Sequence, residues 1–193
     1  ILRCKACQGH VEGKPAHQAA VQPLIHGLPR ERWSIDLTGP FPVAGPQRAK
    51  YLITAVDCFS RFAVVVPIPN KEAITVAEQV IKYIFLAHGT ADLQADRGTE
   101  FRNQYLDSIV AICGQHKFHT TAFKPSTNGK VAKFHRTFNS MLAKVVAENQ
   151  RDWPDHIPYI LFSYNSCAHR STGLSPFFLM YGQQPNWNVH LLL

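Results

Sequence analysis

Residues 51–68 read YLITAVD, then CFSR, then FAVVVPI, and this stretch decides how the chain folds. Its first and third parts are rich in β-branched and aromatic residues, which favour strands. Two such runs joined by a short segment predict an antiparallel hairpin. The expected structure therefore contains a β-hairpin over these residues.

The segments on either side of this hairpin alternate between strand and helix patterns. Upstream, a strand over Trp33–Leu37 is followed by Gly39 and Pro40, which force a loop. Downstream, hydrophobic spacing and breakers predict, in order, a helix through Val76–Phe85 that stops at Gly89, a strand at Ala91–Ala95, a helix at Tyr105–Cys113, a strand at Lys117–Thr121, a long helix after Asn128–Gly129, a helix from about Asp152, and a short helix between Ser175-Pro176 and Gly182.

Three consecutive strands, then strands that alternate with helices, predict an α/β fold. The expected sheet is mixed and has helices on both faces. The effect of Pro158 stays open, because this residue either lies in the early turns of the predicted helix or breaks that helix.

The bulk composition narrows the function classes. The chain has 193 residues with 46% hydrophobic residues, enough for a packed core, and a net charge of +7. That charge favours an acidic partner such as nucleic acid, or is a basic surface that serves solubility. No apolar stretch approaches the ~20 residues that span a bilayer, so no membrane partner is expected. Five scattered cysteines suggest no disulfide framework and favour an intracellular compartment, and the start at Ile1 suggests a fragment.

Two aspartates have the placement that metal-dependent phosphodiester chemistry requires. Such chemistry needs converging carboxylates that hold two divalent cations about 4 Å apart. Asp36 lies in or at the end of the first strand, and Asp96 directly follows the strand at Ala91–Ala95. If these strands are neighbours, both carboxylates point into one cleft. The alternative is turn chemistry, because aspartate near glycine often closes a loop.

Seven blocks in one order carry a resemblance to a known family. They are DLTGP at 36–40, VDCFSRF at 56–62, DRGTEF at 96–101, TTAFKPSTNG at 120–129, Trp153, YN at 164–165 and STGLSPF at 171–177. Over roughly residues 29–185, the chain resembles the integrase catalytic core of retroviruses and gypsy-like LTR retrotransposons.

The resemblance implies a ribonuclease-H-like fold with a five-stranded mixed sheet and helices on both faces. It also implies a triad of two aspartates and a glutamate that uses Mg²⁺ or Mn²⁺, with Asp36 and Asp96 as the two aspartates. DNA as partner, a homodimer and a location in the nucleus follow from the same resemblance.

The third member of the triad is missing. The family glutamate would fall at position 132, with 35 residues between it and Asp96, where this chain has Ala132. Glu148 is sixteen residues further along the same helix, about 24 Å away, and is out of reach. A site that lacks one carboxylate holds at least one cation weakly. We therefore expect DNA strand transfer to be strongly impaired or absent.

The long helix also carries a stripe of polar residues. Positions 128, 132, 136 and 139 lie on one side of it, and basic residues flank them. The residues expected to contact DNA are Lys124, Asn128, Lys130, Lys133, Arg136 and Asn139. A helix that begins at Asn128–Gly129 would also offer backbone N–H groups to a phosphate. The alternative is a solvated helix face.

Cys4 and Cys7 have the spacing of zinc ligands. In the resembled family, such a pair ends an N-terminal zinc module, so residues 1–28 are interpreted as the tail of a truncated Zn²⁺ module plus a linker. Residues 29–185 form the catalytic core and residues 186–193 a C-terminal tail. Completion of the zinc site by His10 and His17, or a plain pair of thiols, remains open.

Three functions stay open on these residues: an active DNA-joining enzyme, a non-catalytic nucleic-acid-binding module of the same fold, and a structural or partner-binding domain. Divalent-metal-dependent nicking of DNA separates the first from the others, and salt-sensitive DNA binding separates the second from the third.

Overall fold

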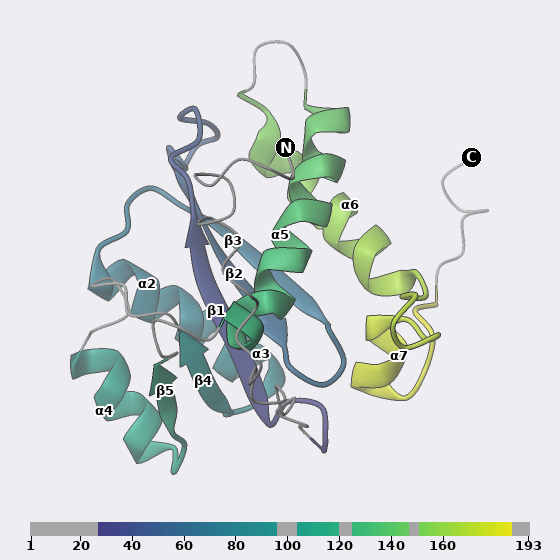
Figure 1. The fold of residues 1–193 in the computed structure, drawn as a ribbon. Helices are drawn as coiled ribbons and strands as arrows, with labels where there is room; N and C mark the ends of the chain where they lie inside the picture. Colours follow the sequence, from purple (N-terminus) through teal and green to yellow (C-terminus); the bar gives the residue numbers. More distant parts are fainter. Residues whose placement is uncertain (1–26, 96–103, 120–124, 147–150, 187–193) are drawn as a thin grey trace, which may run out of the picture.

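The computed structural model describes residues 27–95, 104–119, 125–146 and 151–186. Within these ranges, one mixed sheet is covered by helices on both faces (Figure 1). The predicted α/β class is confirmed.

The sheet has an antiparallel half and a parallel half. Its strand order is β3-β2-β1-β4-β5, in which β1 pairs antiparallel with β2, and β2 with β3, while β1–β4 and β4–β5 are parallel. Strands β1 to β4 have four to seven residues, and β5 at the edge has three. Their bounds are β1 (Arg32–Thr38), β2 (Tyr51–Asp57), β3 (Ala63–Ile68), β4 (Asp92–Ala95) and β5 (Lys117–His119).

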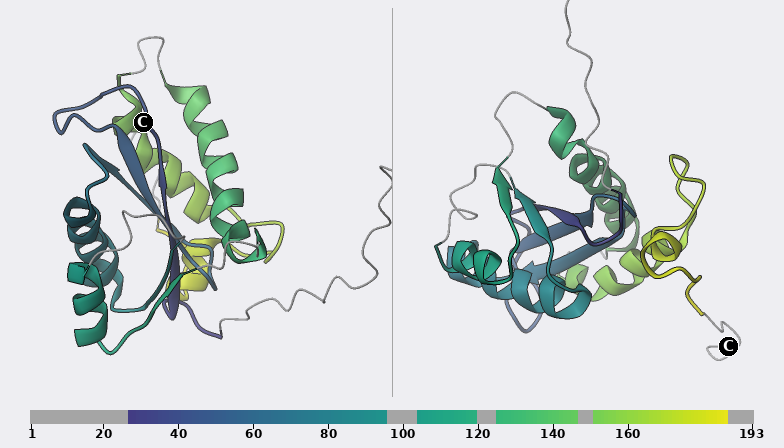
Figure 2. Two further views of the ribbon diagram at one scale, coloured as in Figure 1. Left: turned by 60° about the vertical axis from the view of Figure 1, so that its left-hand side comes forward. Right: turned by 90° about the horizontal axis from the view of Figure 1, so that it is seen from below.

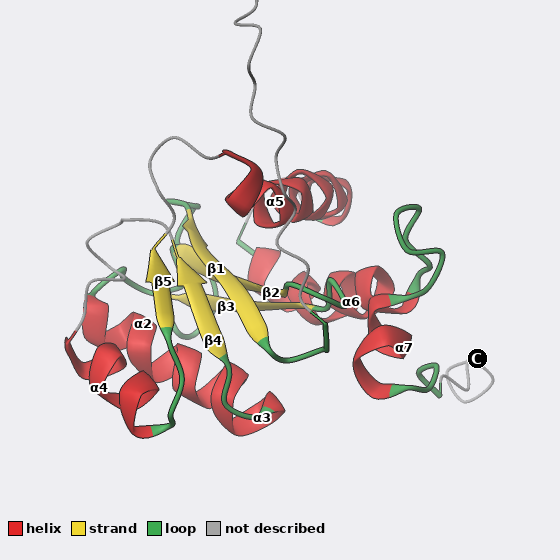
Figure 3. Cartoon of the chain, turned by 60° about the horizontal axis from the view of Figure 1, so that its bottom comes forward, coloured by secondary structure: helices red, strands yellow, loops and turns green. Residues whose placement is uncertain are grey.

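The helices form two layers, one on each side of the sheet (Figures 2 and 3). One layer contains α2 (Ala73–Val80), the π-helical η1 (Ile81–Phe85), α3 (Leu86–His88) and α4 (Gln104–Ile112). The other contains α5 (Pro125–Val145) and α6 (Trp153–Ser166), with the short α7 (Pro176–Tyr181) next to α6. No helix in the described ranges is both long and apolar enough to cross a membrane.

Strand β1 has two different faces because side chains alternate along a strand. Trp33 and Ile35 are fully buried in the cluster that α2, η1 and α4 cover, and Leu37 packs against it. Asp36 and Thr38 therefore point to the opposite face, where α5 lies. This alternation is what brings a carboxylate to the α5 side of the sheet.

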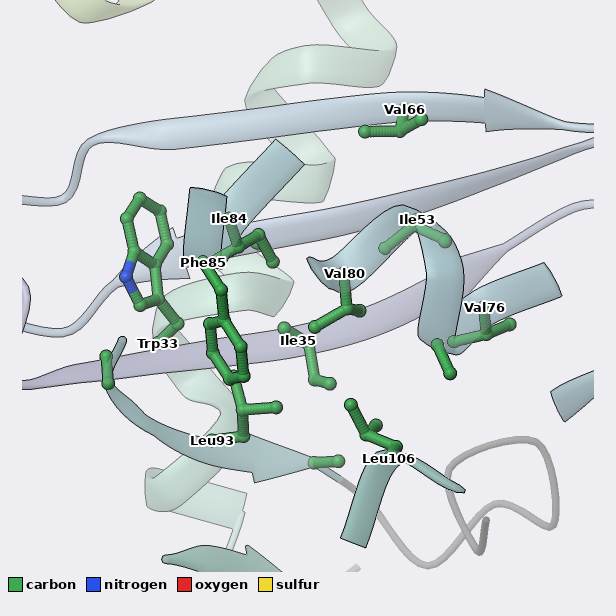
Figure 4. Packing of buried hydrophobic residues seen from close by; sticks show 14 of the residues in the cluster. Trp33, Ile35, Ile53, Val66, Val76, Val80, Ile84, Phe85, Leu93 and Leu106 are labelled. Atoms are coloured by element: carbon green, nitrogen blue, oxygen red, sulfur yellow. The ribbon is translucent and has the colours of Figure 1, made fainter. Parts of the chain in front are cut away.

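The first core cluster lies between the sheet and the α2–α4 layer. Figure 4 shows Val80, Ile84 and Phe85 of the helical segment pointing toward Ile35 and Leu93 of the sheet. The sequence predicted a single helix through this segment. In the structure, the π turn η1 interrupts it and changes the phase of the residues that follow.

The second core cluster lies under α5 and α6. Val131, Phe134, Phe138 and Leu142 are buried, as the helical spacing predicted, but Val145 at the end of α5 is 45% exposed. The rings of Phe134 and Tyr164 meet edge to face, with centroids 4.8 Å apart. Burial of each phenylalanine contributes about 1.5–3 kcal/mol. These contacts fix how α5 lies across the sheet.

Two predictions about the helices can be compared with the structure. Pro158 lies inside α6, which continues to Ser166, so it does not break the helix. The predicted cap of α7 is confirmed: the Ser175 hydroxyl accepts a hydrogen bond from the Phe178 N–H at 3.1 Å, and Gly182 ends the helix with a φ of 75°.

Candidate active site

Asp36 lies on β1 on the face that α5 covers. One carboxylate oxygen, Oδ1, accepts a hydrogen bond from the Leu37 N–H at 2.9 Å. The other, Oδ2, lies 3.6 Å from Nδ1 of His135 on α5. The Asp36 side chain is 31% exposed, so a ligand from solvent can reach it. The predicted first aspartate thus lies where a helix and a strand meet at the surface.

His135 is held between Asp36 and a hydroxyl group. Thr38 Oγ1 lies 3.2 Å from Nε2 and 3.4 Å from Nδ1 of the His135 ring. Burial lowers the pKa of His135, so its imidazole is neutral at physiological pH. His135 is not among the site residues predicted from the sequence. The spacing could have indicated it, because position 135 lies about one helical turn after position 132 and on the same side of α5.

The other two triad positions are only partly described. Residue 132 lies within α5, but the surroundings of its side chain are outside the described part of the structure. Asp96 is also outside it. Strand β4 ends at Ala95, which pairs with Ile35, the residue before Asp36. The prediction that the strands before Asp96 and around Asp36 are neighbours is therefore confirmed, since β4 pairs with β1. The position of the Asp96 carboxylate stays a prediction.

The start of α5 differs from the expectation. The helix begins at Pro125, so Asn128 and Gly129 lie inside it and do not form its N-terminus. Proline is favoured at the first helical position, since its missing N–H is not needed there and its φ is already helical. The predicted helix start at Asn128–Gly129, from which the phosphate contact was inferred, is therefore wrong.

Three of the predicted DNA-contacting side chains are described, and all three are exposed: Lys133, Arg136 and Asn139. Lys133 and Arg61 are also close enough to His169 to help lower the pKa of that histidine, after the larger effect of burial. Basic groups thus extend from α5 to the β2–β3 turn. Lys124 and the side chains of Asn128 and Lys130 lie outside the described residues.

Two other sequence blocks have structural roles. The buried carboxylate of Asp57 accepts hydrogen bonds from Arg30 N–H, Phe59 N–H, and both the N–H and the hydroxyl of Ser60, at 2.7–3.2 Å. The Asn165 amide pairs with both main-chain groups of Ala63 at 2.9 Å. These residues fix the β2–β3 turn and the edge of the sheet.

Cys4 and Cys7, with the whole proposed zinc module, lie outside the described residues. Among the described residues, no three His, Cys, Asp or Glu side chains come together as a metal site. Asp36 and His135 are a pair, and any cation they bind would also need other protein ligands, water or substrate oxygens.

Comparison with known proteins gives one family match. The family described as integrase core domain matches residues 27–127. The chain is 26% identical over 161 residues to the retrovirus-related Pol polyprotein from transposon 412 of Drosophila melanogaster, which covers 83% of this chain and 13% of that protein. It is 30% identical over 185 residues to the Gag-Pol polyprotein of feline leukemia virus, covering 94% of this chain and 10% of that protein. The chain therefore spans only a small part of these relatives.

Two solved structures share the fold. The HTLV-2 integrase catalytic core domain, described in complex with magnesium in a trimeric form, has a TM-score of 0.63 at 19% identity, over 81% of this chain and all of that chain. A simian T-cell lymphotropic virus intasome, described in complex with a PP2A regulatory subunit, has a TM-score of 0.74 at 16% identity, over 96% of this chain and 67% of that chain.

Proposed function

The chain belongs to the integrase core domain family, and we propose that it is the DNA-integration core of a retroelement polyprotein whose strand-transfer chemistry is impaired at position 132. The observation that carries this proposal is the approach of α5 to Asp36, where His135 comes within 3.6 Å of the carboxylate. Residue 132 lies one turn earlier on the same side of that helix. A glutamate there would face the same site, and this chain has alanine.

The residues present fit a divalent cation in part. Asp36 offers a carboxylate oxygen that is accessible to solvent, and carboxylate oxygens are the ligands that Mg²⁺ prefers. In the proposal, Asp36 and Asp96 hold the cations, which would activate the attacking hydroxyl and stabilise the leaving oxygen of 3′-end processing and strand transfer. Without a carboxylate at 132, at least one cation is weakly held, and the reaction slows.

DNA binding does not need that carboxylate. The exposed side chains of Lys133, Arg136 and Asn139 on α5 suit contacts to a phosphate backbone, which would give little sequence preference and a steep dependence on salt. The second candidate function, a non-catalytic nucleic-acid-binding module, rests on this surface together with Ala132. We also propose that the protein acts in the nucleus and that it forms a homodimer.

The test compares the chain with its Ala132→Glu variant in a strand-transfer assay with Mg²⁺ and with Mn²⁺. We expect only the variant to join DNA ends. Equal activity of both proteins would show that the triad assignment is wrong. If neither protein reacts but both bind DNA, the non-catalytic module is the better description.

DNA binding is tested by titration of a duplex at several salt concentrations. The double variant Lys133→Ala/Arg136→Ala should bind more weakly, and the slope of log K against log salt should fall by about two. Lys82→Ala is the matched control, since Lys82 is exposed on η1 across the sheet from α5. A double variant that binds like the control would exclude α5 as the DNA-binding surface.

A further inference from the structure

Tyr164, near the end of α6, is the point at which basic residues from separate elements come together. Its ring meets the Phe134 ring edge to face with centroids 4.8 Å apart, and the His169 ring with centroids 4.5 Å apart. Phe134 directly follows Lys133 on α5, and His169 lies in the connection between α6 and α7. Contacts of Tyr164 therefore bring this part of α5 and the α6–α7 connection to one place.

A third basic residue, Arg61, is held at the same place by the β2–β3 turn. The Asn165 amide pairs with both main-chain groups of Ala63 at 2.9 Å, so the end of α6 lies against the strand two residues after Arg61. Arg61 has a φ of 67°, and its Nη1 donates to the Cys58 carbonyl oxygen at 2.9 Å. A guanidinium group has five N–H donors, so this hydrogen bond orients the group and leaves donors for a ligand.

The charges of these residues act on His169. Burial lowers the pKa of His169, and the hydrogen bond that its Nε2–H donates to the Tyr164 carbonyl oxygen at 3.2 Å raises it. The positive charges of Lys133 and Arg61 lower this pKa again. In the part of the chain that the structure describes, neither Lys133 nor Arg61 forms an ion pair with a carboxylate. Cations that converge without a carboxylate attract an anion from solution.

We propose that Arg61 and Lys133 together bind one backbone phosphate of DNA beside His169, which extends the DNA-contacting surface from α5 onto the β2–β3 turn. This inference rests on the proposed function, because it concerns the same DNA. Asp36 is in register with Thr54, three residues before β2 ends at Asp57, which is about 10 Å along the strand. The bound phosphate is therefore a different one from the reacting phosphodiester at Asp36.

The first experiment titrates the whole chain with a DNA duplex at several salt concentrations. Arg61→Gln should weaken binding and lower the slope of log K against log salt by about one, because one phosphate contact loses a cation. Arg61→Gly removes the same charge and suits the positive φ of this residue, so it serves in case the glutamine variant does not fold. Both variants should give the same result.

Arg48→Gln is the matched control, since Arg48 is also an arginine in a turn with a positive φ, 52°. It lies at the other end of α6, because Gly45 of the same turn packs against Pro154, eleven residues or about 16 Å along the helix from Asn165. The control changes the net charge equally and should keep the salt slope of the unaltered chain. Folded Arg61 variants with the slope of the control would overturn the inference.

A second experiment follows the His169 ring by nuclear magnetic resonance, with the signal assigned from a His169→Gln variant. A bound phosphate places negative charge beside the ring, so the pKa of His169 should rise when the DNA duplex is added. Arg61→Gln should reduce that rise, an effect that a purely structural role of Arg61 in the turn does not predict. A pKa of His169 that is the same with and without bound DNA would contradict the proposed site.

The two proposals can fail separately. If Ala132→Glu joins DNA ends while the Arg61 variants bind DNA like the unaltered chain, the proposed function stands and the phosphate site at Arg61 is wrong. If the Arg61 variants lower the salt slope but Ala132→Glu does not join DNA ends, the phosphate site stands and the strand-transfer proposal is wrong.

Discussion

Replacement of Asn165 by alanine should destabilise the fold strongly, although Asn165 is remote in sequence from the strand it contacts. Its amide donates to the Ala63 carbonyl oxygen and accepts from the Ala63 N–H, each at 2.9 Å. Ala63 is on β3, at the edge of the sheet, and is 1% exposed, while Asn165 is 6% exposed. Asn165 thus satisfies the two main-chain groups that the sheet leaves unpaired at this residue.

The expected loss follows from those two groups. A buried donor or acceptor without a partner costs about 1–3 kcal/mol. Since water can enter part of the space left by the amide, we expect Asn165→Ala to lower the free energy of unfolding by about 2–4 kcal/mol. For a chain of this size, that corresponds to a fall in melting temperature of roughly 10 °C.

The assay is urea unfolding followed by circular dichroism. Ser166→Ala is the control in the neighbouring position. The Ser166 hydroxyl is buried with no hydrogen-bond partner among the described residues, so its removal should leave the free energy of unfolding unchanged or raise it. Asn165→Asp keeps an acceptor for the Ala63 N–H but faces the Ala63 carbonyl with a charge, and should be as harmful as alanine. The reasoning is refuted if Asn165→Ala and Ser166→Ala have equal stability.

Two further predictions concern stability. Burial lowers the pKa of His88, whose Nδ1 lies 3.1 Å from the Tyr181 hydroxyl. The unfolded chain therefore binds a proton at this histidine more readily than the folded chain does. The contribution of His88 to the free energy of unfolding is present above the ordinary pKa of 6.5 and is lost as the pH falls below that value. His88→Gln should make the free energy of unfolding depend less on pH, as measured by urea unfolding at a series of pH values. Equal pH dependence in the variant and the unaltered chain would contradict the prediction. Phe138→Ala should cost about 3–5 kcal/mol of unfolding free energy in the same assay, because Phe138 is 1% exposed, and a loss below about 1 kcal/mol would mean that α5 is not anchored there.

Local patterns in the sequence predicted the elements well. The strands at Tyr51–Asp57 and Ala63–Ile68 and the cap at Ser175 depend on residue type and spacing within a few positions. The start of α5 was predicted wrongly because Asn128–Gly129 resembles a helix boundary, whereas the helix begins at Pro125, a residue that fits the first helical position.

The site was predicted only in part. Asp36 could be proposed from its position at a strand end, and its orientation toward α5 follows from the burial of Trp33 and Ile35 on the other face of β1. The approach of His135 could not be predicted in the same way, since it depends on how α5 crosses the sheet. That crossing is set by contacts such as Phe134 with Tyr164, which join residues from two helices.

The central place of β1 in the sheet also bears on how the chain folds. Its pairing with β2 joins segments that are close in sequence, whereas its pairing with β4 requires the chain between Thr38 and Asp92 to close into a loop. Loop closure costs entropy, and contacts between distant residues slow folding. We expect the β1–β2–β3 amides to gain protection from hydrogen exchange before those of β4. The strand that carries Asp36 would then be in place before β4 pairs with it.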